Sequence, residues 1–297
     1  MHKSGFVNII GRPNVGKSTL TNALVGERMS IITNKPQTTR HRILGLINDE
    51  NFQIVLSDTP GIVVDPSYQM HHAMNRFVQS TFEDADLMLL VTEVHEKYEA
   101  DDATIIRLKK IKAPVFLVIN KIDLARPEEV AELILHWKER LDFAEIFPIS
   151  ALERTNTDRL LETIVSYLPE GPAYYPKDQF TDRPERFFTT EIIREKILEQ
   201  YEQEIPYSVQ VEIESFEDTE TSKGEELARI RALIYVMRRS QKAIIIGKRG
   251  EAIKKLGTES RRALEKFLDR KVFLELYVKV QDNWRDDERQ LKTFGYQ

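Results

Sequence analysis

The feature that most constrains the fold is the segment Gly11-Arg-Pro-Asn-Val-Gly-Lys-Ser18, near the start of the 297-residue chain. Two glycines bracket four residues and are followed by lysine and serine, which is the pattern of a phosphate-binding loop. The pattern is specific only between a strand and a helix, and both are predicted here. An apolar run at 6–10 precedes the loop, and helical spacing begins at Ser18. The sequence therefore predicts a strand–loop–helix unit whose backbone N–H groups bind phosphate.

The remainder of residues 1–170 alternates short apolar segments with amphipathic ones. The apolar segments predict strands at 6–10, 42–48, 52–56, 87–92, 115–119 and 145–149. Apolar residues at helical spacing predict helices at 18–25, 101–109, 128–141 and 157–168. This alternation favours a mostly parallel sheet with helices on both faces, and the short turn after 42–48 predicts one hairpin. The predicted fold class of residues 1–170 is an α/β P-loop NTPase.

A change of composition marks the end of this part. Prolines and a glycine gather after residue 169, which predicts a linker over 171–184. We then predict a helix at 184–203, strands at 209–216 and 227–236, helices at 241–246 and 251–268, and a last strand at 272–280. That order is typical of a small α+β domain, which we assign to 185–282, with a tail at 283–297.

The charge of the chain is distributed unevenly, and its net value of −5 hides this. Residues 1–184 hold 21 Lys and Arg against 26 Asp and Glu, whereas 185–297 hold 22 of each. Within 229–262, 11 Lys and Arg are balanced only by Glu251 and Glu259, a local charge of +9. Such a cluster attracts phosphate backbones, although a solvated helix face is the alternative interpretation. The chain has no cysteine, which excludes a disulfide framework, a thiol nucleophile and a thiolate metal site.

Three short segments predict the phosphate and magnesium contacts. Lys17 is expected to reach the β- and γ-phosphates, and the Ser18 hydroxyl to coordinate Mg²⁺. Asp58, after a strand, is expected to hold Mg²⁺ through water, and the Gly61 N–H to touch the γ-phosphate. Thr39 should complete the Mg²⁺ shell, with Thr38 as the alternative. The predicted phosphate-side contacts are Gly11, Arg12, Pro13, Asn14, Val15, Gly16, Lys17, Ser18, Thr19, Asp58, Thr59, Pro60, Gly61 and Ile62.

The segment Asn120-Lys121-Ile122-Asp123 predicts guanine rather than adenine. It follows a predicted strand, and Asp123 can accept two hydrogen bonds from the guanine ring N–H and amino group. Adenine has no such donor pair and would leave the carboxylate unpaired. Asn120 is expected to brace the loop and Lys121 to lie along the base. A second supporting loop is predicted at Ser150, Ala151 and Leu152, with the Ala151 N–H facing the base oxygen.

A glycine-bracketed loop in the second part resembles the signature of a KH domain. Gly247-Lys248-Arg249-Gly250 lies between two predicted helices, and such loops clamp about four nucleotides of single-stranded backbone. The bare pattern is weak, but the flanking apolar helices, the element order of a type II KH domain and the +9 cluster support it. The predicted RNA contacts are Ile246, Gly247, Lys248, Arg249, Gly250 and Lys254.

The whole chain resembles the Era family of bacterial GTPases. The resemblance is carried by the motifs above, by Gln-Thr-Thr-Arg-His at 37–41, and by Leu-Glu-Leu-Tyr-Val-Lys-Val and Trp-Arg-Asp-Asp-Glu-Arg near the C-terminus. It implies a Ras-like GTPase domain followed by a type II KH domain, which binds GTP or GDP with Mg²⁺. It also implies binding to the 3′ end of small-subunit ribosomal RNA and a role in maturation of the small ribosomal subunit. We expect a cytoplasmic monomer; peripheral membrane association is described for the family, but we recognise no anchor, signal peptide or spanning segment.

The expected hydrolysis is slow. Ras-like enzymes place a Gln after the third motif to orient the attacking water, and Ile62 stands there instead. In relatives with the same Pro-Asn-x-Gly-Lys-Ser loop the asparagine helps bind K⁺, which makes Asn14 a hypothetical K⁺ ligand. We therefore assign catalytic roles to Lys17, Asn14, Thr39 and Gly61. Arg12, Arg40 and Arg42 lie nearby in the sequence, and we expect them to be solvated.

Two other functions remain open on the sequence alone. The chain could be an RNA-binding scaffold whose nucleotide is scarcely hydrolysed, which Ile62 favours. It could also be a membrane-linked signalling GTPase, which the two basic residues of the Gly-x-x-Gly loop argue against.

Overall fold

The computed structural model describes residues 2–33, 35, 37–63, 65–99 and 101–296. The chain divides into two compact units. The N-terminal unit comprises Met1–Ser30, Thr39–Asp65 and Met74–Asp182; the C-terminal unit comprises Ile31–Thr38, Pro66–Ala73 and Arg183–Gln297. In the described part of the chain, no helix has both the length and the apolar character needed to cross a membrane.

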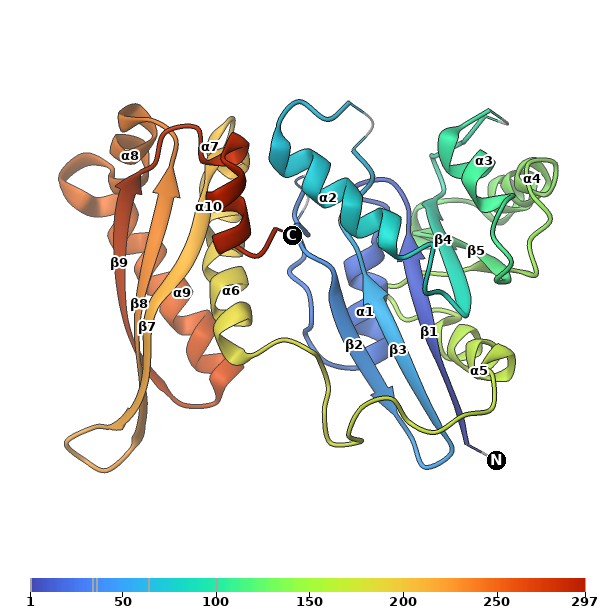
Figure 1. The fold of residues 1–297 in the computed structure, drawn as a ribbon, viewed down its shortest axis with the longest axis horizontal. Coiled ribbons are helices and arrows are strands. Elements are labelled where there is room, and N and C mark those ends of the chain that lie inside the picture. The colour runs from blue at the N-terminus through green and yellow to red at the C-terminus, as the bar shows by residue number, and fades with distance from the viewer. Residues whose placement is uncertain (1, 34, 36, 64, 100, 297) are drawn as a thin grey trace. The chain divides into compact units, whose positions relative to one another are not determined.

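A six-stranded sheet forms the centre of the N-terminal unit (Figure 1). Its order is β2-β3-β1-β4-β5-β6, and every neighbouring pair is parallel except the β2–β3 hairpin. The α/β class and the hairpin are therefore confirmed. The strands are β1 (Lys3–Ile10), β2 (Ile43–Asn48), β3 (Phe52–Asp58), β4 (Leu87–Glu93), β5 (Val115–Asn120) and β6 (Glu145–Pro148).

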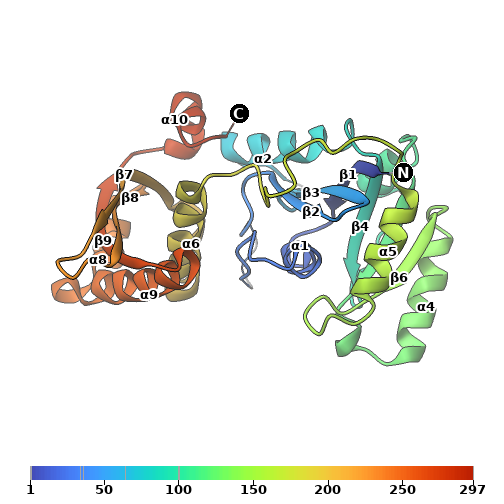
Figure 2. The ribbon, with the colours of Figure 1, turned by 90° about the horizontal axis from the view of Figure 1, so that it is seen from below.

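Helices cover both faces of this sheet because successive strand side chains point to opposite faces. On one face, Val7 and Ile9 of β1 pack with Leu20 of α1 and Leu160 of α5. On the other face, Ile10 of β1 lies in a second apolar cluster with side chains of α2, α3 and α4. Figure 2 shows α1 and α2 on opposite sides of β2 and β3. The helices are α1 (Lys17–Val25), α2 (Gln69–Ser80), α3 (Ala103–Leu108), α4 (Pro127–Lys138) and α5 (Thr157–Tyr167), with the 3-10 turn η1 (Ile122–Leu124).

The helix α2 is absent from the sequence predictions above. Its apolar residues have clear helical spacing, since Met70, Ala73, Met74 and Val78 are all buried. The sequence pattern was sufficient to find it, but the predicted helices left out the residues between Gly61 and the strand at 87–92.

The segment predicted as a linker lies along the edge strand of the sheet. The Leu46 N–H of β2 donates to the Phe180 carbonyl at 2.9 Å, and Asn48 Nδ2 donates to the Gln179 carbonyl at 2.8 Å. Gln53 Oε1 also accepts from the N–H groups of Tyr174 and Tyr175. These contacts cover an edge that would otherwise expose unpaired backbone groups.

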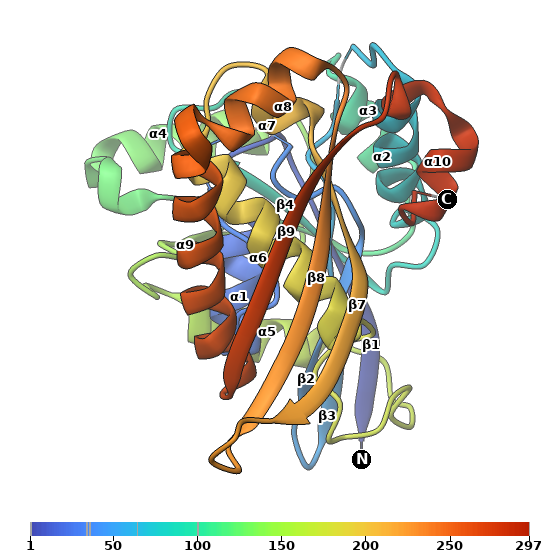
Figure 3. The same cartoon turned by 90° about the vertical axis from the view of Figure 1, so that its left-hand side faces the viewer.

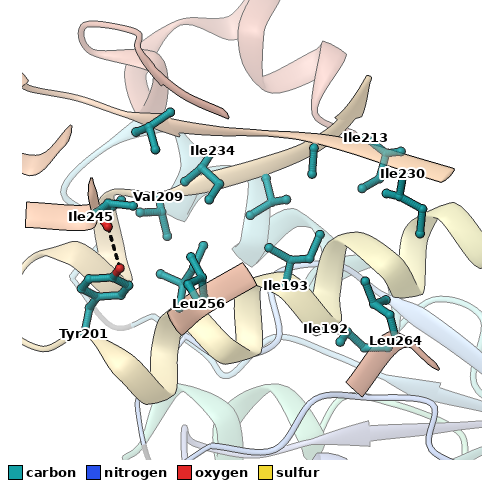
Figure 4. Packing of buried hydrophobic residues seen from close by; sticks show 14 of the residues in the cluster. Ile192, Ile193, Tyr201, Val209, Ile213, Ile230, Ile234, Ile245, Leu256 and Leu264 are labelled. Carbon is teal, nitrogen blue, oxygen red and sulfur yellow. Dashed lines mark hydrogen bonds between the residues drawn. The ribbon is translucent and has the colours of Figure 1, made fainter. Parts of the chain in front are cut away.

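The C-terminal unit is a three-stranded sheet backed by helices (Figure 3). The β7–β8 pair is antiparallel and the β8–β9 pair is parallel, so the predicted element order and the smaller α+β class are confirmed. Figure 4 shows the shared apolar core, in which the Tyr201 hydroxyl donates to the Ile245 carbonyl at 2.8 Å. The elements are α6 (Glu185–Gln200), α7 (Ile205–Ser208), β7 (Gln210–Glu220), β8 (Glu226–Val236), α8 (Arg239–Ile246), η2 (Lys248–Gly250), α9 (Glu251–Leu268), β9 (Lys271–Val280), η3 (Trp284–Asp286) and α10 (Glu288–Thr293).

The C-terminal tail packs on the C-terminal unit. Trp284 is fully buried, its Nε1 donates to the Ser208 carbonyl at 3.0 Å, and its ring meets Phe294 edge-on. The sequence interpretation of Trp284 as a packing residue is confirmed.

Candidate nucleotide-binding and nucleic-acid sites

The parallel strands end at one edge of the N-terminal sheet, where loops carrying the predicted residues gather. β1 ends at Ile10 before the phosphate-binding loop, β3 ends at Asp58, and β5 ends at Asn120. Ligands of parallel α/β sheets bind at this carboxyl edge. The topology therefore brings the three motifs together, although they are separated by up to about 100 residues.

The phosphate-binding loop needs its two glycines for space and for backbone conformation. Gly16 has φ +95°, and a Cβ built there would lie 2.1 Å from Asn120 Nδ2. A Cβ at Gly11, where φ is +153°, would lie 2.2 Å from the Val91 carbonyl oxygen. Any side chain at either position would displace a neighbouring residue, so the loop can only take this form with glycine.

Lys17 lies inside the loop it follows. Its ammonium donates to the carbonyls of Gly11 at 2.9 Å and Arg12 at 2.8 Å. Burial lowers the pKa of Lys17 to about 8, although the charges of Asp58 and Glu96 act in the opposite direction. The ammonium is thus aimed into the space that the loop encloses.

Three hydroxyl and carboxylate groups converge beside the loop. Ser18 Oγ lies 2.9 Å from Thr39 Oγ1 and 2.8 Å from Asp58 Oδ2. The alternative residue, Thr38, instead donates to the Lys35 carbonyl at 2.6 Å and contacts Thr33. The structure therefore brings Thr39, and not Thr38, to Ser18.

The same cluster fits Mg²⁺. Asp58 is fully buried, and burial raises the pKa of its carboxyl against the opposing hydrogen bonds from Ser30 and Ser18. Its Oδ1 is buried and, among the residues that the structure describes, has no hydrogen-bond partner, which is a costly arrangement unless a cation or its water meets that oxygen. An all-oxygen set of hydroxyls and a carboxylate is the kind of site that Mg²⁺ prefers.

The third motif contacts the phosphate-binding loop directly. Thr59 Oγ1 donates to the Ile9 carbonyl at 2.6 Å, which anchors the segment after β3 to β1. A Cβ at Gly61 would lie 2.8 Å from Pro13, so Gly61 is packed closely on the loop. Ile62 is partly buried against the apolar cluster of α2, α3 and α4. Its side chain offers no group that could orient water.

Asn120 joins the two sides of the site. Its Nδ2 donates to the Val15 carbonyl and its Oδ1 accepts the Ala151 N–H, both at 2.9 Å. The bracing role expected of Asn120 therefore has a geometric basis. The Ala151 N–H, which the sequence analysis directs toward the guanine oxygen, donates to Asn120 Oδ1 in this structure. Asp123 is exposed at the start of η1, and Leu152 is exposed in the neighbouring loop.

A cavity of about 380 Å³ opens beside the phosphate-binding loop. It extends from the loop to Lys121 and the segment after β4. Its lining residues are Arg12, Pro13, Asn14, Val15, Glu93, His95, Glu96, Lys97 and Lys121.

The arginines expected to be solvated are held by partners, which corrects that expectation. The Arg12 guanidinium lies 4.0 Å from the ring centroid of Tyr98 and 2.9 Å from an Asp102 oxygen. Arg42 pairs with Asp84 at 2.7 Å and donates to Ser57, and Arg40 is fully buried. None of these partners adjoins its arginine in sequence, so no local pattern could have revealed them.

The Gly-x-x-Gly loop of the C-terminal unit is open to solvent. Gly247 (φ +73°) ends α8, and Gly250 (φ +79°) precedes α9, so both glycines adopt conformations that other residues avoid. Lys248 and Arg249 between them are exposed, as is Lys254 on α9. Among the described residues, no carboxylate forms an ion pair with any of these three side chains. The loop therefore presents unpaired positive charge, which suits a phosphate backbone.

Comparisons with known proteins agree with both sites. The family described as 50S ribosome-binding GTPase matches residues 6–121, and the KH domain family matches residues 204–285. GTPase Era of Clostridium kluyveri is 48% identical over 297 residues, which covers 100% of both chains. The chain belongs to the Era family of GTPases.

Solved Era structures have the same fold over the full length. A crystal structure of Era in complex with MgGDPNP and nucleotides 1506–1542 of 16S ribosomal RNA has a TM-score of 0.93 and 40% identity, covering 100% of this chain and 99% of that one. An Aquifex aeolicus Era variant bound to GDP·AlF₄⁻ has a TM-score of 0.92 and 40% identity, covering 99% of each chain. The Ras-like domain followed by a type II KH domain is thus the architecture of the Era family.

The Era motifs omit two residues that the structure brings to the magnesium cluster. Ser30 Oγ donates to Asp58 Oδ2 at 2.6 Å, and Asn22 accepts the N–H groups of Met29 and Ser30 at 2.9 Å each. Both residues lie outside the motifs quoted in the sequence analysis. A single serine after a helix matches no sequence motif, so the sequence did not reveal it.

Proposed function

We propose that this chain hydrolyses GTP to GDP and phosphate, binds the 3′ end of small-subunit ribosomal RNA, and acts in assembly and maturation of the small ribosomal subunit. The observation that carries the proposal is the full-length match to the Era structure holding MgGDPNP and 16S ribosomal RNA nucleotides. The match includes both units, so nucleotide and RNA binding are supported in one chain. The family description that names the 50S ribosome concerns residues 6–121 alone.

The nucleotide roles follow from the geometry of the loops. Lys17 and the loop N–H groups bind the β- and γ-phosphates, since the ammonium already points into the loop. Asp123 reads the guanine N–H and amino group. Asn120 holds the guanine loop and the phosphate-binding loop next to each other through its hydrogen bonds to Ala151 and Val15.

Ser18 and Thr39 are the residues that would ligate Mg²⁺, and Asp58 would accept from its bound water. The ion neutralises charge on the β- and γ-phosphate oxygens. Gly61 contacts the γ-phosphate through its N–H, which its close packing on Pro13 supports.

Hydrolysis transfers the γ-phosphoryl group from GTP to water, and GDP is the leaving group. This chain has no glutamine at position 62, so its own residues hold the phosphates but do not orient the attacking water. Slow intrinsic turnover follows. We propose that Asn14 helps bind K⁺ beside the phosphates, where a second cation would stabilise the charge that develops during transfer.

RNA binding belongs to the Gly247–Gly250 loop. The glycines permit close approach of a backbone phosphate, and Lys248, Arg249 and Lys254 supply positive charge. Small-subunit RNA as the partner favours action in the cytoplasm. We also propose that the chain acts as a monomer. Peripheral membrane association is a separate proposal, and lipid flotation with and without RNase would test it.

The first experiment measures phosphate release from GTP in K⁺ and in Na⁺ buffer, with and without an RNA oligonucleotide of the 3′ end of small-subunit ribosomal RNA. We expect slow release that K⁺ and the RNA both increase. In the Gly250→Asp variant the RNA effect should disappear, because a carboxylate replaces open space beside the phosphate backbone. Gly224→Asp is the matched control, since Gly224 has φ +77°. As at Gly250, no described residue other than its sequence neighbours lies within 4 Å of its Cβ position.

Two outcomes would contradict the proposal. If RNA stimulates phosphate release equally in Gly250→Asp and Gly224→Asp, the Gly247–Gly250 loop does not take part in RNA binding. GTP binding without turnover under every condition would instead favour an RNA-binding scaffold, the second candidate, which the partly buried Ile62 supports. Equal rates in K⁺ and Na⁺ would exclude only the Asn14 role.

A further inference from the structure

One carboxylate oxygen in the magnesium cluster accepts two hydroxyl hydrogen bonds. Asp58 Oδ2 accepts from Ser18 Oγ at 2.8 Å and from Ser30 Oγ at 2.6 Å. Ser30 is buried, with 3% of its surface exposed. In the described part of the chain, the second oxygen, Oδ1, has no hydrogen-bond partner. The two oxygens of this carboxylate therefore have different environments, and Ser30 is one of the two residues that cause the difference.

Ser30 is held in place by a second side chain. Asn22 Oδ1 accepts from the N–H groups of Met29 and Ser30 at 2.9 Å each, and Asn22 Nδ2 donates to the Ser30 carbonyl at 2.8 Å. Asn22 lies on α1, the same helix that carries Ser18 in its first turn. The helix thus fixes both hydroxyl donors to Asp58, one directly and one through a three-bond clamp.

We propose that Ser30, positioned by Asn22, sets the affinity of the site for Mg²⁺ by orienting the Asp58 carboxylate. With Oδ2 engaged by two hydroxyls, Oδ1 is left to accept from a metal-bound water. Hydroxyl–carboxylate bonds of this length are charge-assisted and strong. Outer residues that orient metal-binding groups change metal affinity by about 10–100-fold. Ser30 and Asn22 are positioning residues, because neither is expected to touch the ion.

The hydrogen bonds that join Asn22 to Met29 and Ser30 also fix the position of the chain just before residue 31. Ser30 immediately precedes residues 31–38, and Thr39, which follows them, meets Ser18 at 2.9 Å. Both ends of that segment are therefore attached to the group of residues around Asp58. Loss of the Ser30 hydroxyl would leave Asp58 Oδ2 with the Ser18 bond alone, while Asn22 would still hold the Ser30 backbone.

This inference rests on the proposed GTP and Mg²⁺ binding, and its test is designed to separate the two. The full chain is loaded with fluorescent mant-GDP, and the rate of its release is measured over a range of free Mg²⁺ with an EDTA end point. For Ser30→Ala, the Mg²⁺ concentration that halves the release rate should rise about tenfold. The rate in EDTA should stay within about twofold of the unchanged chain, because phosphate and base contacts are retained.

Three further variants distinguish positioning from a general structural effect. Ser30→Thr keeps the hydroxyl and should restore the Mg²⁺ midpoint. Asn22→Ala releases the clamp and should shift the midpoint in the same direction as Ser30→Ala, which keeps the inference testable where Ser30→Ala folds poorly. Thr21→Val is the matched control on α1, since the Thr21 hydroxyl is buried but finds no hydrogen-bond partner among the described residues. It should leave the midpoint unchanged.

The inference fails if Ser30→Ala leaves the Mg²⁺ midpoint unchanged while mant-GDP still binds. It also fails if release in EDTA rises as much as release in Mg²⁺, because the serine would then act on the nucleotide or the fold. Absence of mant-GDP binding by the unchanged chain would overturn the proposed function itself.

Discussion

Replacement of Gly16 by alanine should weaken nucleotide binding by displacing Asn120. Gly16 lies in the phosphate-binding loop, and Asn120 is the last residue of β5. The new Cβ would stand 2.1 Å from Asn120 Nδ2, a separation that non-bonded atoms do not reach. Asn120 must therefore move and lose its bonds to the Val15 carbonyl and the Ala151 N–H. At about 1 kcal/mol each, these bonds account for about 2 kcal/mol.

The backbone adds a second contribution. Gly16 has φ +95°, and a residue with a Cβ in the left-handed region costs about 1 kcal/mol more than glycine. The sum is about 3 kcal/mol, or roughly 150-fold in affinity. We expect GDP affinity, measured by fluorescence titration at fixed Mg²⁺, to fall by that order. Gly26→Ala is the control, since Gly26 has φ +82° but, within the described part of the chain, only its sequence neighbours lie within 4 Å of its Cβ position. Its GDP affinity should stay within about twofold of the unchanged chain.

A double-mutant cycle tests the mechanism. In an Asn120→Ala background the obstructing amide is gone, so Gly16→Ala should lower GDP affinity only about fivefold, which corresponds to the backbone cost of about 1 kcal/mol. The coupling between the two positions should therefore be about 2 kcal/mol. An equal loss of affinity from Gly16→Ala in both backgrounds would refute the argument, because the clash would then not act through Asn120.

Three further predictions concern the C-terminal unit. Burial raises the pKa of Tyr201 to about 12, so the unfolded chain deprotonates first and this stabilisation, present below pH 10, is lost as pH rises from 10 to 12. Between pH 9 and 11 the free energy of unfolding should fall by about 1 kcal/mol more in the unchanged chain than in Tyr201→Phe, as measured by urea denaturation. Trp284→Ala removes a fully buried ring and its bond to the Ser208 carbonyl, and should lower the free energy of unfolding by about 3–5 kcal/mol in the same assay. An alanine Cβ at Gly247 would lie 2.5 Å from the Ala252 Cβ, so Gly247→Ala should weaken RNA binding in a filter assay while Gly224→Ala does not. Equal RNA affinities in those two variants would contradict the packing argument.

The sequence predicts those parts of the molecule whose geometry is set locally. A phosphate-binding loop requires glycine at particular positions, and the left-handed backbone at Gly16 and Gly250 shows why the pattern is informative. Strand and helix periodicity is also local, which is why the strands and most of the helices could be predicted along the chain. The parallel topology then brings Asp58 and Asn120 to one edge without any further information.

The remaining features depend on partners distant in sequence. Arg12 meets Asp102, Asn48 meets Gln179, and Ser30 meets Asp58; none of these pairs has a spacing that a pattern could detect. The helix α2 is different, because its periodicity is visible and it was omitted from the prediction. The hydrogen bond from the Ala151 N–H to Asn120 could not be predicted from the sequence, because an N–H in a loop has several acceptors within reach.

The position of Asn120 links recognition of the base to binding of the phosphates. Its side chain bonds the loop that carries Gly16 on one side and the loop that carries Ala151 on the other. Asn120 is itself buried and is the last residue of β5. A change at Asp123 that shifts this backbone would therefore also move Asn120 and the Val15 carbonyl. Base preference and phosphate affinity are then coupled properties of one structure, and a substitution that relaxes guanine preference should also weaken the hold on the phosphates.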